Sequence, residues 1–162
     1  MIRKFALTMA AILLSSATQA QEAVTGVADR AALFHSSDPL LEARKQVVYH
    51  ILTDIFEGGR LDLADEYMTE RYIQHDPNIG SGREAIKTYM RVHPLPQKGE
   101  IPVFAVVAEG DIIVVASADA LPRPDKPGET YTTTHFEMWR FKGTKVDEHW
   151  DEITMSSPPD AR

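Results

Sequence analysis

The sequence predicts an α+β domain in which N-terminal helices pack against an antiparallel sheet. Three observations support this fold class. Apolar residues between positions 40 and 92 recur at helical spacing, whereas the chain after Pro96 consists of β-rich runs joined by short turns. Helical and extended segments do not alternate along the chain, so a parallel sheet of β–α–β units is not expected. The chain also has no cysteine, which excludes disulfides, thiolate metal sites and cysteine nucleophiles.

The first 20 residues predict a cleaved export signal. Arg3 and Lys4 give a positive start, an apolar run covers residues 5–14, and Thr18 and Ala20 suit the positions before a signal-peptidase cut. Spanning a bilayer takes about 20 apolar residues, and this run is shorter. We therefore expect a mature protein that is periplasmic or secreted and is not held in a membrane.

The rest of the chain is long enough for one domain with one hydrophobic core. Residues 21–37 are rich in small and polar side chains, which predicts a flexible leader. The domain itself is expected over residues 38–155, and residues 156–162 are expected to be a disordered tail. The chain carries 17 basic and 24 acidic residues, a formal charge of -7. Such a surface repels phosphate backbones and anionic lipids, so we expect no nucleic-acid partner and no membrane partner.

Three helices are expected before the sheet. The first begins with Asp38 as N-cap and Pro39 at the first helical position, and Gly58 and Gly59 end it. Its apolar residues at helical spacing are Leu40, Leu41, Val47, Val48, Ile51, Leu52, Ile55 and Phe56. A second, short helix is expected over residues 61–68, and a third over residues 83–92. Between them the pattern predicts a short extended segment at residues 71–75 and turns at residues 76–82.

The second half of the chain predicts two hairpins. Residues 101–108 and 112–118 are β-rich and are separated by a Glu-Gly-Asp turn. A polar loop with three prolines is expected over residues 121–130. The second hairpin comprises residues 131–141 and 145–153 around Gly143.

This second hairpin carries the densest set of titratable side chains. Alternation along a strand places His135, Glu137 and Trp139 on one face of the first strand, and His149 and Asp151 together on the other strand. Antiparallel pairing then brings Glu137 close to His149 or Asp151. Burial raises the pKa of a carboxyl group and lowers that of a histidine, so such a set exchanges protons near neutral pH. The alternative is a solvated surface whose charge pairs each contribute less than about 1 kcal/mol.

Three further residues are candidates for contact with a small molecule. His75 lies where a strand meets a turn, a position from which a side chain can point into a cavity mouth. The alternative is that His75 and Asp76 only cap the turn. Tyr72, three residues earlier, is a second candidate, although it need not share the face of His75. His50 lies among the apolar residues of the first helix, where we expect it to line the core or a groove.

No metal or cofactor is expected. Histidines and carboxylates at positions 75, 135, 137, 149 and 151 offer a set that could converge on a metal ion, which remains an alternative. No local ligand spacing such as H-E-x-x-H supports it. The chain also lacks a phosphate-binding glycine loop and a G-x-S-x-G elbow, so neither nucleotide use nor serine hydrolysis has support.

Three blocks of sequence carry a family resemblance over about residues 40–153. They are YIQHDP at 72–77 followed by GREA at 82–85, the hairpin at 106–115, and WRFK at 139–142 followed by KVDEHWD at 145–151. These blocks resemble the SnoaL-like, or polyketide cyclase-like, branch of the nuclear-transport-factor-2-like superfamily. The chain departs from the family pattern at two positions, with Asp76 in place of Asn and Glu137 in place of Asp.

The resemblance implies a cone-shaped fold in which the helices pack on a curved antiparallel sheet. It also implies acid–base catalysis without a cofactor, as in an aldol-type cyclase, isomerase or dehydratase acting on a small apolar or aromatic carbonyl compound. By analogy Asp151 is the base, and His149, His135 and Glu137 orient the substrate or share the proton. The side chains expected to contact the substrate are those of His75, Tyr72, Trp139 and His50.

A second reading of the same resemblance is a non-catalytic module. In that case the cone binds a ligand, or supports a dimer, without turnover. Domains of this superfamily often dimerise through the outer surface of the sheet. Phe136, Met138 and Trp150 would supply apolar contacts there, so a homodimer is a further expectation.

Overall fold

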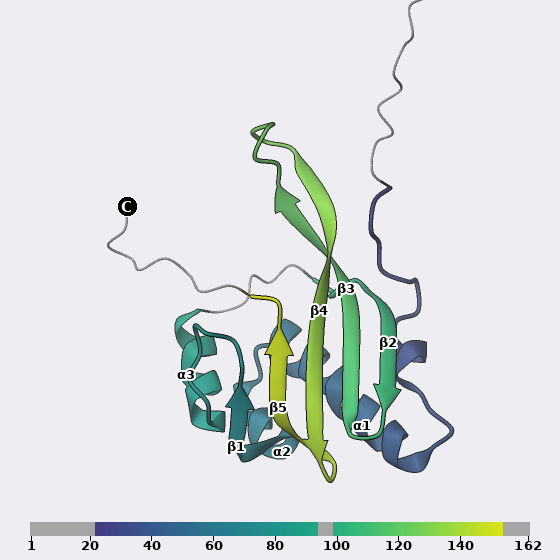
Figure 1. Ribbon diagram of the computed structural model, residues 1–162, viewed down its shortest axis with the longest axis vertical. Helices are drawn as coiled ribbons and strands as arrows, with labels where there is room; N and C mark the ends of the chain where they lie inside the picture. The colour runs from purple at the N-terminus through teal and green to yellow at the C-terminus, as the bar shows by residue number, and fades with distance from the viewer. Residues whose placement is uncertain (1–21, 94–98, 154–162) are drawn as a thin grey trace, which may run out of the picture.

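The computed structural model describes residues 22–93 and 99–153 of the chain, with the helices first and the strands second (Figure 1). The helical elements are a 3-10 turn Ala31–Phe34, α1 Pro39–His50 with a π-helical continuation Ile51–Glu57, a second 3-10 turn Leu61–Leu63, α2 Ala64–Tyr67 and α3 Arg83–Val92. The strands are β1 Met68–Gln74, β2 Val103–Glu109, β3 Ile112–Pro122, β4 Thr130–Lys142 and β5 Lys145–Asp151. The predicted α+β class is confirmed. The predicted export signal and tail lie outside the described residues.

One mixed sheet contains all five strands, in the order β1-β5-β4-β3-β2. The three pairings among β2, β3, β4 and β5 are antiparallel, as predicted for two hairpins. The pairing of β1 with β5 is parallel, which the sequence did not predict. Its register places Gln74 beside His149. Because β1 and β5 are far apart in the sequence, no tight turn constrains their relative direction.

The first helix is held against the sheet by its cap and by one buried cation. Asp38 accepts hydrogen bonds from the backbone N–H groups of Leu40 (2.8 Å) and Leu41 (2.9 Å), so the predicted N-cap is confirmed. Buried Arg44 donates to the backbone oxygens of Gly143 (2.9 Å) and Gly110 (2.6 Å). One helix residue therefore ties α1 to the turns of both hairpins.

The helix that begins at Pro39 ends at Gly58 and Gly59, as predicted. Gly59 adopts the left-handed conformation (φ 68°) that commonly terminates a helix, and the backbone N–H of Arg60 then donates to the oxygen of Asp54 at 2.9 Å. Helices α1 and α2 lie behind the sheet and α3 lies beside β1 (Figure 1). No helix in the described ranges is long and apolar enough to cross a membrane.

The hydrophobic core lies between these helices and one face of the sheet, the inner face. Its largest fully buried side chains come from the 3-10 turn Ala31–Phe34, from α1 and its π-helical continuation, and from strands β1 to β5. They are Trp139, Phe34, Ile51, Leu52, Ile55, Met68, Ile113, Val48, Val103, Val115 and Val146. The apolar residues that predicted the first helix differ in burial. Val48, Ile51, Leu52 and Ile55 are buried, whereas Leu40 is 47% exposed. The opposite, outer face of the sheet carries no helix in Figure 1.

The segment before α1 is packed onto the domain, which differs from the flexible leader that the sequence predicts. Phe34 is fully buried in the core. Arg30 is also buried, pairs with both carboxylate oxygens of Glu57, and donates to the backbone oxygen of Ile101 (3.0 Å). The small and polar composition of this segment conceals the two side chains that anchor it, because each finds its partner far along the chain.

The central hairpin is longer than the sequence predicts. Strand β3 continues to Pro122 and β4 starts at Thr130, so the predicted loop at residues 121–130 is reduced to 123–129. The paired ends of the two strands form an arm that projects beyond the sheet (Figure 1). His135 lies near the base of this arm, where it pairs with Ser117.

Candidate functional site

Four titratable side chains meet on the inner face of the β4–β5 hairpin, and we call them the inner-face cluster: His135, Glu137, His149 and Asp151. The strand register pairs Trp139 with His149 and Glu137 with Asp151. This confirms the predicted alternation and the predicted proximity of Glu137 to both residues of β5. His149 is 4% exposed, so the cluster continues into the core rather than lying on a solvated surface.

Glu137 is the centre of the cluster. One of its carboxylate oxygens is in hydrogen-bond contact with Nε2 of His149, and the other lies 3.0 Å from Nε2 of His135. Burial alone would raise the pKa of Glu137, but the hydrogen bonds from the two histidines outweigh it and lower that pKa to about 2. Glu137 therefore stays ionised at neutral pH and acts as the shared anion of two imidazole rings.

His135 bridges two carboxylates. Its Nε2 contacts Glu137, and its Nδ1 lies 2.7 Å from the carboxylate of Glu152. The hydrogen bond with Glu137, opposed by burial and aided by both negative charges, raises the pKa of His135 to about 9. Since each ring nitrogen faces an acceptor, the ring is held as an imidazolium ion at neutral pH.

Asp151 is the one carboxylate of the cluster that no cation neutralises. Among the described residues, no Lys, Arg or His nitrogen lies within ion-pair distance of it. It accepts one hydrogen bond, from the backbone N–H of Ile153 at 3.1 Å. Burial raises the pKa of Asp151. The hydrogen bond from Ile153 and the charge of His149 oppose this increase, and the nearby carboxylates of Glu137 and Asp76 add to it. A partly buried carboxylate with a raised pKa is a better proton acceptor than an ordinary aspartate.

The ring of His149 is enclosed by two aromatic side chains. Trp139 lies against it at 5.3 Å between ring centroids and Tyr72 at 6.4 Å, both close to parallel. Tyr72 and Trp139 were predicted as substrate contacts, and the structure brings both of them to the cluster. Burial, followed by the charges of Glu137 and Asp151, raises the pKa of Tyr72 well above its ordinary value, so its hydroxyl stays protonated.

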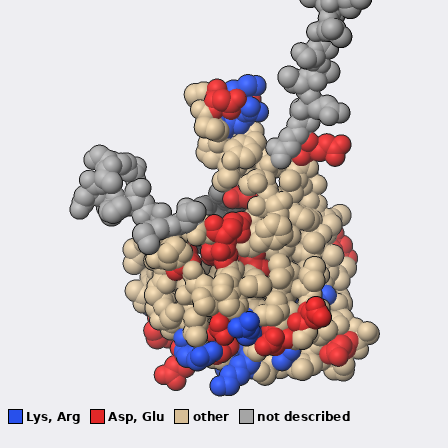
Figure 2. All heavy atoms as spheres, in the orientation of Figure 1, with Lys and Arg blue, Asp and Glu red and all other residues tan. Residues whose placement is uncertain are grey.

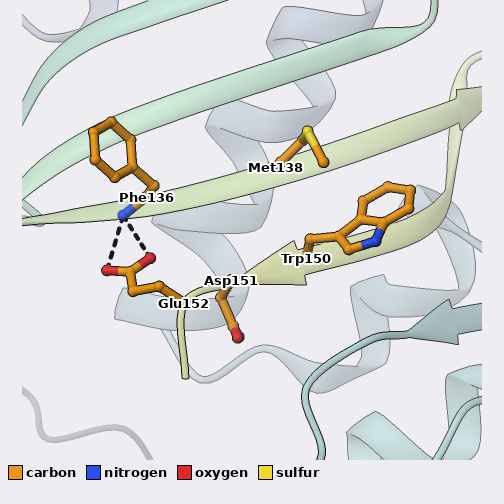
Figure 3. A pocket seen from close by; sticks show the side chains of 5 residues that line it. All are labelled: Phe136, Met138, Trp150, Asp151 and Glu152. Atoms are coloured by element: carbon orange, nitrogen blue, oxygen red, sulfur yellow. Dashed lines mark hydrogen bonds between the residues drawn. The ribbon is translucent and has the colours of Figure 1, made fainter. Parts of the chain in front are cut away.

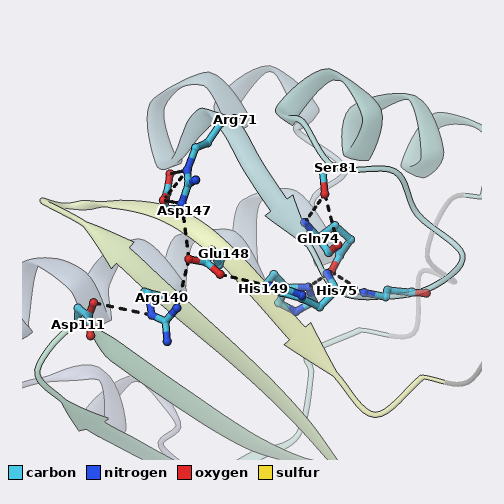
Figure 4. A network of polar contacts seen from close by, with 10 residues as sticks. Arg71, Gln74, His75, Ser81, Asp111, Arg140, Asp147, Glu148 and His149 are labelled. Carbon is cyan, nitrogen blue, oxygen red and sulfur yellow. Dashed lines mark hydrogen bonds and ion pairs between the residues drawn. The ribbon is translucent and has the colours of Figure 1, made fainter.

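Gln74 is a member of the site that the sequence reasoning did not identify. It is buried, and its side-chain oxygen lies 3.0 Å from Nδ1 of His149 (Figure 4). Gln74 lies two residues after Tyr72 on β1, so strand alternation places both on the inner face. That alternation was a signal in the sequence, but the partner strand was not, because the parallel β1–β5 pairing is long-range.

His75 faces away from the cluster, which corrects its predicted placement at a pocket mouth. Its ring stacks on Trp150 with centroids 4.4 Å apart, and its Nε2 lies 3.2 Å from Glu148. Glu148 in turn pairs with Arg71 and Arg140, so the ring of His75 belongs to a network of charges on the outer face (Figure 4). His75 follows Gln74 directly, and successive residues of a strand point to opposite faces.

The turn after β1 is capped by Asp76, as the alternative reading of this segment proposed. Asp76 is buried and accepts a hydrogen bond from the backbone N–H of Asn78 at 2.7 Å. Asp76 also contributes to the raised pKa of Asp151 after burial, so the turn acts on the cluster through its charge.

His50 lies outside the cluster, and its predicted burial is wrong. Its side chain is 46% exposed, its Nδ1 lies 3.1 Å from Asp54, and its ring stacks on Tyr67. The apolar residues that surround it in the sequence point to a different side of the helix. Helical spacing alone does not decide on which edge of an apolar stripe a histidine lies.

Three members of the cluster offer a geometry that could hold a metal ion. Glu137, His149 and Asp151 each provide one ligand atom, and these atoms lie within 4.8 Å of one another. The alternative set of positions 75, 135, 137, 149 and 151 does not converge, because His75 is on the outer face. In the arrangement described, ring N–H groups of His135 and His149 donate to the two carboxylate oxygens of Glu137, so these oxygens already have partners.

The outer face of the same hairpin has a shallow hollow of about 240 Å³. Phe136, Met138, Trp150, Asp151 and Glu152 line it (Figure 3). Asp and Glu side chains gather near this end of the hairpin, whereas Lys and Arg gather toward the other end of the same face (Figure 2). Phe136 is 52% exposed, which is unusual for an aromatic side chain in the middle of a strand.

Comparison with known proteins agrees with the fold and with the resemblance noted above. The sequence profile of the SnoaL-like domain matches residues 50–149, more than half of the chain. A candidate SnoaL-like polyketide cyclase from Jannaschia sp. CCS1 has 20% identity and a TM-score of 0.56, over 73% of this chain and 91% of that one. A candidate polyketide cyclase from Acidithiobacillus ferrooxidans has 16% identity and a TM-score of 0.55, over 72% and 89%.

A third similar structure is TerC, crystallised with polyporic acid, with 16% identity and a TM-score of 0.53 over 69% of this chain and 92% of that one. At these identities the likeness concerns the fold. No curated protein matches the chain.

Proposed function

This chain belongs to the SnoaL-like domain family, and from that premise we propose that it performs acid–base chemistry on a small carbonyl compound without a cofactor. The reaction class is that of an aldol-type cyclase, an isomerase or a dehydratase. The residues that carry it are Asp151 as the base and the His149–Glu137–His135 chain as the group that orients the substrate and shares its proton.

The observation that carries the proposal is the state of Asp151. Two carboxylates lie side by side on paired strands, yet their environments differ. The pKa of Glu137 is lowered by two histidines, whereas burial raises that of Asp151. Neighbouring groups whose pKa values are driven apart are the pattern expected of an acid–base site. A purely structural cluster would neutralise both carboxylates.

The chemistry balances with these groups alone. Ionised Asp151 removes a proton from the carbon next to a substrate carbonyl, and the electron pair moves onto the carbonyl oxygen to form an enolate. The positive charge of His135 stabilises that oxygen. In a ring closure the enolate carbon attacks a second carbonyl of the same molecule, and the new alkoxide receives the proton from Asp151. In an isomerisation the proton returns to a different carbon.

The surroundings of the cluster support an aromatic or flat apolar ligand. Trp139 and Tyr72 stack on the ring of His149, and all three side chains are buried. The indole N–H of Trp139 is buried and has no hydrogen-bond acceptor among the described residues. An unpaired buried donor costs about 1–3 kcal/mol, which a ligand oxygen would recover. Polyporic acid, with which TerC was crystallised, is a reason to include acidic aromatic compounds among the candidates.

A non-catalytic binding module is the second candidate, and one observation favours it. Both nitrogens of His135 and both of His149 already face protein acceptors, so the histidines are fully used in the absence of a ligand. Such a network stabilises a fold as well as a reaction. In that case the same residues would bind a ligand, and Asp151 would set only its affinity.

The experiment that separates the two is a thermal-shift panel of small ketones, diketones and aromatic hydroxyketones, followed by product analysis of every compound that raises the melting temperature. The enzyme reading predicts that at least one stabilising compound is converted to a product of equal mass, or to one lighter by one water. Stabilising compounds that are all recovered unchanged would support the binding module.

Two further proposals concern the state of the protein. We propose that it acts outside the cytoplasm, in the periplasm or as a secreted protein, on the basis of the N-terminal signal pattern. We also propose a homodimer formed through the outer face of the sheet. Phe136 (52% exposed) and Val107 (65% exposed) lie on this face with Met138 and Trp150, which makes an apolar patch that a second copy would cover.

A further inference from the structure

We propose that Gln74 is a positioning residue that holds a proton on Nδ1 of His149 and thereby makes Nε2 the nitrogen that exchanges a proton with Glu137. The position of the proton follows from the hydrogen bonds alone. Its effect on turnover rests on the proposed function.

The orientation of the Gln74 amide is determined by its neighbours. Its side-chain oxygen accepts hydrogen bonds from the backbone N–H groups of His75 (2.9 Å) and Asp76 (3.1 Å). A backbone N–H only donates, so the atom that faces both of them is the oxygen and not the NH₂ group. Flipping the amide would place its NH₂ group against the two backbone N–H groups, which also donate. The position of the oxygen is therefore established without assuming a tautomer for any histidine.

The same oxygen determines the tautomer of His149. It lies 3.0 Å from Nδ1 of the ring, and two atoms that both accept cannot share a hydrogen bond. Nδ1 must therefore carry a hydrogen in every protonation state of the ring that keeps this contact. One carbonyl oxygen thus accepts three N–H groups, which the buried position of Gln74 makes costly to break.

The backbone of β1 and the core keep Gln74 and the ring in register. Gln74 and His149 are direct neighbours in the parallel β1–β5 pairing. The backbone N–H of Gln74 donates to the hydroxyl of Ser81 at 3.0 Å, and this contact is drawn beside His149 in Figure 4. The stacked rings of Trp139 and Tyr72 prevent the imidazole from turning over. Position and tautomer are therefore fixed together.

The consequence concerns the nitrogen that faces Glu137. With Nδ1 permanently protonated, the only proton that His149 can gain or lose is the one on Nε2. Nε2 faces the ionised carboxylate of Glu137, so it donates to that carboxylate, and its proton is the one that the pair can pass on. If the neutral ring carried its proton on Nε2 instead, it could donate to Glu137 but could not accept from it. Gln74 thus gives the pair its capacity to move a proton in both directions.

The test is nuclear magnetic resonance of the purified protein labelled with ¹⁵N-histidine, in which long-range couplings report which ring nitrogen carries hydrogen. The variants are Gln74→Leu, which removes the acceptor, and Gln74→Glu, which keeps an oxygen at the same place. Gln46→Leu is the matched control, because Gln46 is a partly buried glutamine on α1 that bonds to the backbone oxygen of Phe34 instead.

We expect Nδ1 of His149 to carry a hydrogen in the native protein, in Gln74→Glu and in Gln46→Leu. In Gln74→Leu, at least about half of the His149 rings should carry a hydrogen on Nε2 and none on Nδ1, and the rate constant kcat should fall more than tenfold with little change in KM. If Gln74→Leu does not fold, Gln74→Met supplies the same test with a side chain of similar length.

A ring that keeps its hydrogen on Nδ1 without the Gln74 oxygen would overturn the proposal. So would a native ring protonated on Nε2 alone. The failure of the proposed function is distinguishable, because it would leave the tautomer result intact and remove only the effect on kcat.

Discussion

Glu137 and His149 are hydrogen-bonded diagonally across the β4–β5 pairing, since the direct partner of Glu137 is Asp151 and that of His149 is Trp139. This diagonal leaves the carboxylate of Asp151 without a cation and places it beside an imidazole that already serves another anion. The chemical character of the site follows from that arrangement. It gives one carboxylate that stays ionised and one that has the raised pKa of a general base.

The first prediction concerns the charge state of His135. The hydrogen bond to Glu137 is the largest cause of its raised pKa, and Glu152 contributes less. The variant Glu137→Gln should therefore lower the pKa of His135 from about 9 toward the ordinary 6.5, as measured by nuclear magnetic resonance titration. Glu152→Gln is the matched control and should produce a smaller decrease. A larger effect from Glu152→Gln would show that the cluster is centred elsewhere.

The second prediction concerns stability as a function of pH. The pKa of His135 is raised in the folded state, so its stabilisation is complete below pH 6.5 and is lost as the pH rises through about 9. The pKa of Glu137 is lowered in the folded state, so its stabilisation is complete above pH 4.5 and is lost as the pH falls toward about 2. From these two groups, the free energy of unfolding should be highest between pH 4.5 and 6.5.

Urea denaturation at a series of pH values measures this profile. The variant His135→Gln should lose the decrease in stability between pH 6.5 and 9. It should also weaken the acid limb without removing it, because His149 remains to lower the pKa of Glu137. A native protein whose stability rises steadily from pH 6 to pH 9 would contradict the assigned ion pairs.

The third prediction concerns the segment before α1. Phe34 is fully buried, so Phe34→Ala should lower the free energy of unfolding by about 3–5 kcal/mol in chemical denaturation. Val27→Ala lies in the same segment on a 41% exposed side chain and should change it by less than about 0.5 kcal/mol. Equal effects of the two substitutions would mean that the segment is loosely attached, as its composition alone suggests.

The fourth prediction concerns self-association. If a second copy covers the outer face, Phe136→Asp should convert a dimer into a folded monomer, as measured by analytical ultracentrifugation at micromolar concentration. Leu40→Asp is the control, because Leu40 is 47% exposed on α1, away from the sheet. A native protein that is monomeric at that concentration would exclude the proposed interface.

Much of the fold could be predicted because its signals are local. The cap at Asp38, the helix at residues 83–92 and the alternation on β4 and β5 each depend on neighbouring residues, and the structure agrees with all three. The proximity of Glu137 to His149 follows from one tight turn, so it too was within reach of the sequence.

The features that escaped prediction depend on distant partners. Phe34 and Gln74 find their contacts across the parallel β1–β5 pairing or in the core, for which no adjacent residue is a signal. The face of His75 was missed because the extended segment predicted at residues 71–75 carries no local signal for which of its two faces packs on the core. A shift in register after Arg140 also displaces Asp147 toward Thr69 and Arg71, and no local residue pattern marks this irregularity.

Asp147 and Asp151 are both aspartates of β5, and we expect different roles for them. Asp147 should contribute to stability and Asp151 to turnover. Asp147 is buried, accepts hydrogen bonds from Thr69 (2.6 Å) and Arg71 (2.8 Å), and lies outside the cluster. Asp151 makes no ion pair among the described residues, and burial disfavours its charge. The variant Asp147→Asn should therefore lower the melting temperature and retain turnover. Asp151→Asn should lose turnover and leave the melting temperature unchanged or slightly higher.

The most direct test is the turnover and melting temperature of Asp151→Asn, measured with a compound from the ligand panel that the native protein converts. We predict that kcat falls by at least about 100-fold, the range expected for the loss of a general base, while the melting temperature stays the same or rises slightly. Native turnover in this variant, with a lowered melting temperature, would contradict the assignment of Asp151 as the base and would make the inner-face cluster a structural feature.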